Sequence, residues 1–201
     1  QSTLKVNLIL MAGLPASGKS SFASYASKEL SIPVIAKDDI KEKLFDAIGF
    51  KSYSEKTQLD IAAANIMMFL ASKMLEVGKS VILDNNFEDR NIENLKAVIE
   101  KYPCNVITVR FDCDMKEAYR RYVLRDKDPS RHIGHVLMTC YPPVEGVVDA
   151  VKDMTEESFC EKYTRRGTMR FSMGKLICVD ATDFKSVCYP QILQQLKAVL
   201  V

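Results

Sequence analysis

The residues with the clearest chemical meaning lie near the start of the chain. Positions 13–20 read Gly-Leu-Pro-Ala-Ser-Gly-Lys-Ser, which fits the spacing G-x-x-x-x-G-K-[ST] of a phosphate-binding loop, or P-loop. Glycines at these positions let backbone N–H groups turn inward around phosphate oxygens at the start of a helix. Lys19 is expected to reach the β and γ phosphates of ATP, and the Ser20 hydroxyl to ligate Mg²⁺. The residues expected to hold the nucleotide are Gly13, Pro15, Ala16, Ser17, Gly18, Lys19, Ser20 and Ser21.

Such a loop needs a strand before it and a helix after it, and the sequence predicts both. Residues 5–11 form a short apolar run typical of a buried strand, and residues 20–30 carry apolar side chains at helical spacing. Further strands are expected at 34–36, 81–83, 105–111 and 176–179, and helices at 39–48, 55–77, 92–99, 115–125, 155–163 and 190–201. Because strands and helices alternate, we expect a doubly wound α/β fold with five parallel strands. The helix at 55–77 is expected to turn one apolar stripe inward, made of Leu59, Ala62, Ala63, Ile66, Leu70 and Met74.

Composition narrows the class of protein. The chain has 201 residues, which suits one domain, and its 28 Lys and Arg against 26 Asp and Glu give a net charge of only +2. A polynucleotide partner is therefore less favoured than a small molecule, but it stays open. No apolar run approaches the length of a membrane span, and no signal-like stretch precedes the first strand, so a cytoplasmic location is expected. The sequence does not indicate an oligomeric state.

A P-loop alone does not distinguish an ATPase, a GTPase and a kinase. The chain contains no N-K-x-D guanine-binding motif, and Asp84 at the end of the third strand is followed by Asn85 rather than Glu. Both features favour a kinase. A kinase needs a carboxylate beside the acceptor hydroxyl, and Asp38 and Asp39 follow the second strand. Asp39, with Glu42 three residues on, fits a capping box, so Asp38 is the expected base.

These residues resemble the P-loop kinases of the zeta-toxin, chloramphenicol phosphotransferase and polynucleotide 5′-hydroxyl kinase type. The resemblance covers residues 5–135 and implies a fold like that of the nucleoside monophosphate kinases. It implies that Asp38 accepts the acceptor proton and that Lys41 stands where such enzymes carry a basic residue, often Arg. Lys41 then either steers an anionic acceptor or is merely solvated. Residues 84–87 resemble the acceptor-side segment of polynucleotide kinases, which implies acceptor contacts for Asp84, Asn86 and Arg90 and a water-mediated Mg²⁺ contact for Asp84.

The most basic window after the loop lies at about 116–135 and is expected to form a helical lid. Arg121 and Arg125 are four residues apart on a predicted helix, and Arg131 opens the segment Arg-His-Ile-Gly-His. This segment is similar to the R-H-P-G-H lid segment of small ATP-binding kinases, with Ile133 in place of Pro. Arg125 and Arg131 are expected to act on the transferring phosphoryl group and Arg121 on the nucleotide, unless the window is only a solvated helix face. Residues 136–174 are expected to be an insertion on the acceptor side.

The sequence therefore predicts an ATP- and Mg²⁺-dependent kinase for a hydroxyl on a small polar or nucleotide-like molecule. Two alternatives remain open at this point. One is a polynucleotide 5′-hydroxyl kinase, and the other is a regulatory module that binds ATP without transferring phosphate.

Overall fold

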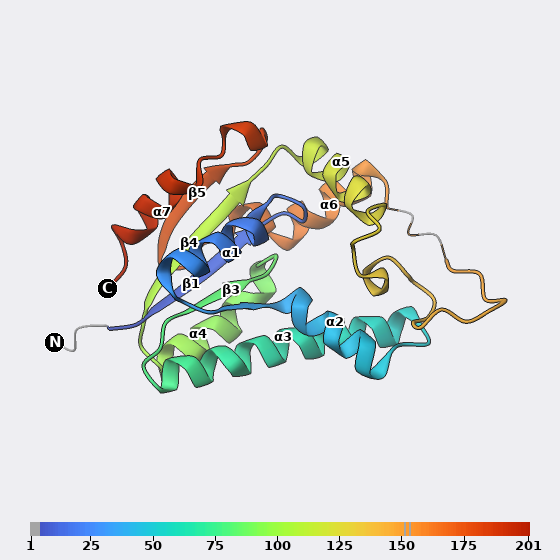
Figure 1. Ribbon diagram of the computed structural model, residues 1–201, viewed down its shortest axis with the longest axis horizontal. Helices are drawn as coiled ribbons and strands as arrows, with labels where there is room; N and C mark the ends of the chain where they lie inside the picture. Colours follow the sequence, from blue (N-terminus) through green and yellow to red (C-terminus); the bar gives the residue numbers. More distant parts are fainter. Residues whose placement is uncertain (1–4, 151, 153) are drawn as a thin grey trace.

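Five parallel strands form one sheet at the centre of the protein (Figure 1). The computed structural model describes residues 5–150, 152 and 154–201. The strand order is β2-β3-β1-β4-β5, which places β3 between β1 and β2. The strands are β1 (Asn7–Gly13), β2 (Val34–Ala36), β3 (Val81–Asp84), β4 (Asn105–Asp112) and β5 (Lys175–Asp180). The predicted five-stranded parallel sheet is therefore confirmed, and all five strands end at the same edge.

Helices cover both faces of this sheet, as the prediction of a doubly wound fold requires. Helices α1 (Lys19–Leu30) and α7 (Tyr189–Lys197) pack on one face, where the rings of Phe22 and Phe111 lie 5.7 Å apart. Helices α3 (Tyr53–Glu76) and α4 (Ile92–Lys101) pack on the other face. The helix α2 (Lys37–Ile48) lies along α3, while α5 (Met115–Asp126) and α6 (Glu156–Arg166) form a separate cluster around Phe159 (Figure 1).

The face that α3 turns to the sheet differs from the predicted one. Ile66 and Leu70, expected inward, are 36% and 39% exposed. Ala63 is buried as expected, and the other buried apolar side chains of this helix are those of Met67, Ala71 and Leu75. Apolar residues surround most of this helix, so the apolar spacing does not single out one face. Met67, Ala71 and Leu75 belong to the core cluster that α3 shares with the strands.

The long segment between α5 and β5 contains the short helix that the sequence predicts there. This helix is α6, and the Thr155 hydroxyl caps it by accepting a hydrogen bond from the Ser158 backbone N–H. Residues 141–150 form a loop that reaches away from the sheet (Figure 1). Among the residues that the structure describes, no helix is long and apolar enough to cross a membrane.

The contact between α1 and the sheet gives a prediction of stability. Phe22 is fully buried between β4 and α7, so Phe22→Ala should lower the free energy of unfolding by about 3–5 kcal/mol. Phe69 on α3 is 59% exposed, and Phe69→Ala should cost less than about 1 kcal/mol. Urea denaturation followed by circular dichroism measures both values. Equal losses for the two variants would contradict this assignment of the core.

Candidate active site

The loop between β1 and α1 has a backbone that only small residues permit. Gly13 has φ 138°, and a Cβ atom there would lie 2.5 Å from the Phe111 carbonyl oxygen. Gly18, with φ 89°, is the N-cap residue of α1. The loop therefore turns at both glycines of the predicted motif and delivers the chain to the N-terminus of a helix, where backbone N–H groups have no partner within the helix.

Two polar side chains inside this loop are poised for an anion. Lys19 is buried, and its Nζ donates a hydrogen bond to the Leu14 carbonyl oxygen at 3.3 Å. Burial lowers the pKa of Lys19 below its ordinary value. The buried Ser17 hydroxyl has no hydrogen-bond partner among the described residues. Buried polar groups are normally paired, so a cradle with a spare hydroxyl and a buried ammonium fits a phosphate group.

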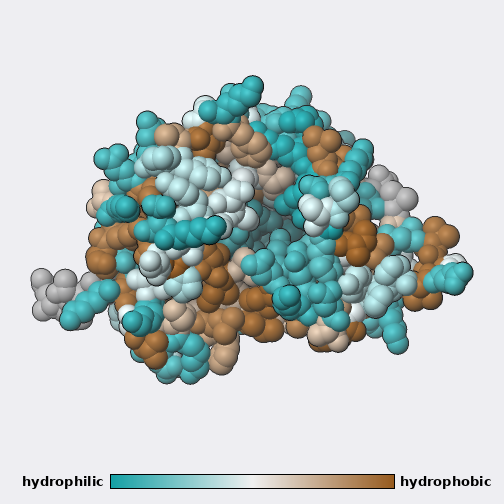
Figure 2. Space-filling view, viewed as in Figure 1, coloured by the Kyte–Doolittle hydropathy of each residue, from teal (hydrophilic) through white to brown (hydrophobic). Residues whose placement is uncertain are grey.

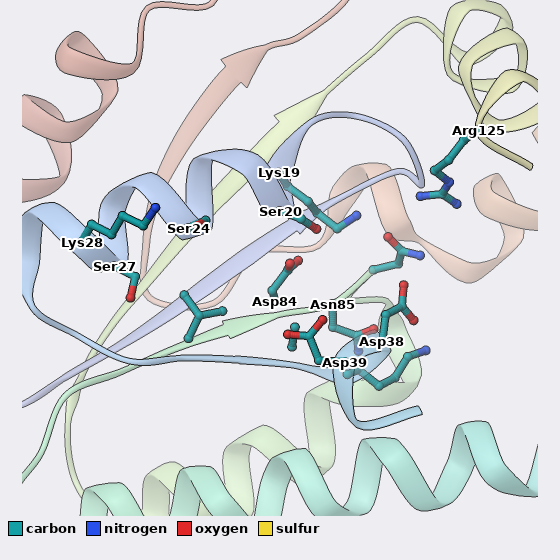
Figure 3. Close-up of a pocket in the computed structure, with 14 residues that line it drawn as sticks. Lys19, Ser20, Ser24, Ser27, Lys28, Asp38, Asp39, Asp84, Asn85 and Arg125 are labelled. Carbon is teal, nitrogen blue, oxygen red and sulfur yellow. The ribbon is translucent and has the colours of Figure 1, made fainter. Parts of the chain in front are cut away.

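Asp84 stands beside the loop because of the strand order. In the sheet register it lies level with Met11 of β1 and Ala36 of β2. Burial raises the pKa of the Asp84 carboxyl, and the nearby Lys19 ammonium and Ser20 hydroxyl oppose that shift. In Figure 3 the side chains of Lys19, Ser20 and Asp84 point toward one another. Hydroxyl and carboxylate oxygens are ligands that Mg²⁺ prefers, so Ser20 and Asp84 fit a magnesium ion.

The two acidic residues after β2 both belong to the first turn of α2. The helix begins at Lys37, directly after the strand, and its N-cap is Ala36 with no side-chain cap. The predicted capping role of Asp39 is therefore wrong, and both Asp38 and Asp39 face a cavity (Figure 3). Burial acts to raise the pKa of Asp38, but neighbouring cations, Lys37 foremost, hold it below its usual range. Asp38 is thus an ionised carboxylate.

Two cavities open on either side of the loop. The first, the α1–α2 cavity, has a volume of about 440 Å³ and is lined by residues that include Lys19, 37–39, 84–86 and Arg125. The second, the α1–α5 cavity, has a volume of about 1030 Å³ and lies between residues 16–21, one side of α5 and residues 182–185. Both are lined by Lys19, Ser20 and Arg125. In Figure 2 hydrophilic residues surround a hollow near the middle of the face shown.

The three predicted lid arginines, Arg121, Arg125 and Arg131, take different positions, and only Arg125 lines both cavities. Arg125 lines both cavities, its buried Nε has no partner among the described residues, and burial lowers its pKa. Arg131 instead pairs with Asp126 at 3.1 Å and is not among the residues that line either cavity. The structure therefore places Arg125 beside Lys19 and Ser20 on the walls of both cavities, and Arg131 outside those walls.

Arg121 supports the wall of the α1–α5 cavity. Its guanidinium donates to the carbonyl oxygens of Ala181 and Thr182, both at 2.6 Å, and lies 3.5 Å from the centre of the Phe184 ring. Most of its hydrogen-bonding capacity is used within the protein, so Arg121 fixes the loop after β5. Sequence reasoning missed Phe184, which lines this cavity next to Thr182 and Asp183.

The predicted acceptor-side residues are only partly brought together. Asn86 lines the α1–α2 cavity, and its buried Oδ1 has no partner among the described residues. Arg90 pairs with Glu88, outside the lining residues. Lys41 also lies outside the lining and pairs with Asp60 at 2.9 Å. Sequence reasoning overlooked Lys37, which lines the cavity and whose position directly before Asp38 was the available signal.

The two histidines of the lid segment bind α2 rather than the loop. The Nε2 atom of His135 lies 2.8 Å from Glu42 Oε1, and that of His132 lies 2.9 Å from Asp46 Oδ1. Beneath them, Lys56 donates a hydrogen bond to the His135 carbonyl oxygen at 2.9 Å. No cluster of potential metal ligands occurs within the described part of the chain. The segment is therefore held against α2 by side-chain contacts.

Together, the parallel sheet, the P-loop and its buried lysine define an α/β P-loop fold. The likeness to solved kinase structures confirms the predicted P-loop kinase fold and the resemblance. A family model described as an AAA domain matches residues 8–143, so the chain belongs to that family. No curated protein matches the chain.

Several solved structures share this fold. A provisionally assigned kinase from Chloroflexus aurantiacus J-10-fl is 22% identical with a TM-score of 0.81, over 98% of this chain and 100% of that one. A gluconokinase from Sinorhizobium meliloti 1021 is 12% identical with a TM-score of 0.54, over 98% and 92% of the two chains. A chain of the Pnkp1/Rnl/Hen1 RNA repair complex is 17% identical with a TM-score of 0.56, over 82% of this chain and 45% of that one.

The lysine beneath the lid segment gives a prediction of pH dependence. Burial lowers the pKa of Lys56 from 10.5 to about 7. Between those values the unfolded chain binds this proton and the folded protein does not, so stability should rise with pH across that window. Lys56→Met removes the linkage, so its melting temperature should gain less than that of the wild type between pH 6 and pH 9. The exposed Lys73→Met is the control, and parallel curves for wild type and Lys56→Met would contradict the prediction.

Proposed function

We propose that this protein is an ATP- and Mg²⁺-dependent phosphotransferase that moves the γ-phosphoryl group of ATP to a hydroxyl of a small polar or nucleotide-like acceptor. The observation that carries the proposal is the meeting of two cavities at Lys19, Ser20 and Arg125. A nucleotide on one side and an acceptor on the other would place the transferred group at this junction, which in-line displacement requires.

The α1–α5 cavity suits the nucleotide. Phe184, which is half exposed and stacked on Arg121, offers a ring face to a base, and the loop at residues 13–20 offers N–H groups and Lys19 to the phosphates. Ser20 and Asp84 would hold Mg²⁺, which supplies positive charge to the phosphate oxygens when bound. Arg125, which lines both cavities, would contact the γ-phosphoryl group from the opposite side.

The reaction then uses groups of the α1–α2 cavity. The acceptor hydroxyl oxygen attacks the γ-phosphorus, and the bond from that phosphorus to the β–γ bridging oxygen breaks, which releases ADP. Asp38 is the ionised carboxylate that would take the hydroxyl proton. Asn85, where a hydrolase would carry a water-activating Glu, also lines this cavity and cannot accept a proton.

The lining of the α1–α2 cavity favours a small polar acceptor. Among the described residues that line it, hydroxyl, amide, carboxylate and amino side chains predominate, and none is aromatic. Proteins that bind single-stranded nucleic acid typically stack bases on aromatic side chains. The similar gluconokinase phosphorylates a polyhydroxyl compound, as its name states, which supports the same choice. The polynucleotide 5′-hydroxyl kinase remains the second candidate, supported by the likeness to a chain of an RNA repair complex.

A transfer assay tests the proposal. Purified protein with Mg²⁺ and ATP labelled at the γ position is offered sugars, sugar acids, nucleosides and a 5′-hydroxyl oligonucleotide, and labelled products are separated. Transfer to a small acceptor, abolished in Lys19→Met, is the expected result. Transfer to the oligonucleotide alone, with affinity falling steeply with salt, would favour the second candidate. Tight ATP binding without transfer to any acceptor would favour the regulatory module.

The choice of base gives a sharper prediction. Asp38→Asn keeps the size of the side chain but cannot take the proton, so kcat should fall by about 10²- to 10⁴-fold with little change in ATP affinity. Asp39→Asn should lower kcat by less than about 10-fold, because Asp39 lines the cavity without being the base. Phosphoryl transfer to the identified acceptor measures both. An inactive Asp39 variant beside an active Asp38 variant would reverse the assignment.

A further inference from the structure

Lys37 adds a cation to the wall of the α1–α2 cavity, which Lys19 and Arg125 also line. It is the first residue of α2, directly before Asp38, and its side chain is 13% exposed on the wall of the α1–α2 cavity. Lys19 comes from α1 and Arg125 from α5. Burial lowers the pKa of Lys19, and the charges of Arg125 and Lys37 act in the same direction. Three cations from three helices therefore surround one space.

Asp60 of α3 fixes Lys37 in this position. One carboxylate oxygen, Oδ1, lies 3.0 Å from the Lys37 Nζ and 2.9 Å from the Lys41 Nζ. These ammonium groups hold the pKa of Asp60 far below its usual range against the opposing effect of burial. A lysine side chain is flexible, and a half-buried ion pair reduces that freedom. Lys37 keeps two N–H donors beyond the one that faces Asp60.

The wall of the α1–α2 cavity carries charges of both signs. It is lined by four cations, Lys19, Lys28, Lys37 and Arg125, and by the carboxylates of Asp38, Asp39 and Asp84. Arg125 and Lys37 both act to lower the pKa of Lys19, so repulsion among these cations disfavours their charged forms in the empty site. A phosphoryl group in transfer carries negative charge on three equatorial oxygens, and its arrival would offset this repulsion.

We propose that Lys37 is a catalytic cation that contacts the transferring phosphoryl group from the acceptor side, and that Asp60 is a positioning residue that acts through Lys37. The inference rests on the proposed phosphotransferase function. The first turn of α2 would then carry both the base, Asp38, and the cation that stabilises the phosphoryl group during transfer, Lys37.

The complex of ADP, Mg²⁺ and aluminium fluoride tests this without a known acceptor, because the fluoride species imitates the planar phosphoryl group. Calorimetry measures how much aluminium fluoride increases the affinity for ADP. Lys37→Met keeps the length of the side chain and removes its charge, so this increase should fall by about 10- to 100-fold. Affinity for ADP alone should stay within about twofold, because ADP lacks the γ group.

Lys41→Met is the matched comparison. It also removes an ion pair to Asp60 Oδ1, but Lys41 is outside the residues that line the cavity, so the increase should change by less than about threefold. Asp60→Asn should also reduce the increase in ADP affinity that aluminium fluoride causes, as Lys37→Met does. In the double variant Asp60→Asn with Lys37→Met, aluminium fluoride should increase the affinity for ADP by as much as it does in Lys37→Met alone, because Asp60 acts through Lys37.

The outcomes separate the two proposals. A wild-type protein that binds ADP but gains nothing from aluminium fluoride would overturn phosphoryl transfer itself, and the role of Lys37 with it. A wild-type gain that persists in Lys37→Met would overturn the role of Lys37 alone. Equal losses in Lys37→Met and Lys41→Met would also overturn it, since the effect would then come from the shared ion pair.

Discussion

The buried ammonium of Lys19 is the charge on which the rest of the site depends. A cation taken out of water needs compensating charge nearby, and Asp84 and Asp38 supply it. The strand order makes this possible, because β3 lies between β1 and β2 and so sets Asp84 level with Met11 and Ala36. The loop, the magnesium-type ligands and the candidate base are thus brought together by one feature of the sheet, the meeting of three strand ends.

Helix α2 extends this arrangement outward. Its carboxylates at positions 38, 42 and 46 are spaced four residues apart and lie along one side of the helix. Asp38 faces the cavity, whereas Glu42 and Asp46 hold His135 and His132. The opposite partner, α3, holds α2 through Asp60. The candidate base is therefore set at the end of a helix that is fixed on two sides, so its position does not depend on one flexible side chain. This is the preorganisation that catalysis by positioned groups requires.

Local signals explain what could be predicted from the sequence. The P-loop, the short apolar strands and most helices depend on neighbouring residues, and the structure confirms them. The predicted capping role of Asp39 was wrong because α2 begins at Lys37, two residues before the predicted start, directly after a three-residue strand. The prediction of the inner face of α3 was wrong in part, because apolar side chains surround most of this helix. Arg90 and Arg131 lie outside the cavity walls because Glu88 and Asp126 pair with them, and such contacts depend on chain folding rather than on spacing.

The difference between the two cavities also gives the proposed transfer its direction. An aromatic ring and a guanidinium face line one side of the loop, whereas polar side chains without an aromatic ring line the other among the described residues. Of these two cavities, only the α1–α5 cavity would offer stacking to a base, and in the proposed complex this would turn the γ phosphate toward Asp38. Asn85 offers no carboxylate to activate water, and Asp38 lines the cavity that the proposed acceptor would fill. An acceptor bound there would exclude water from Asp38, which would favour transfer to its hydroxyl over hydrolysis.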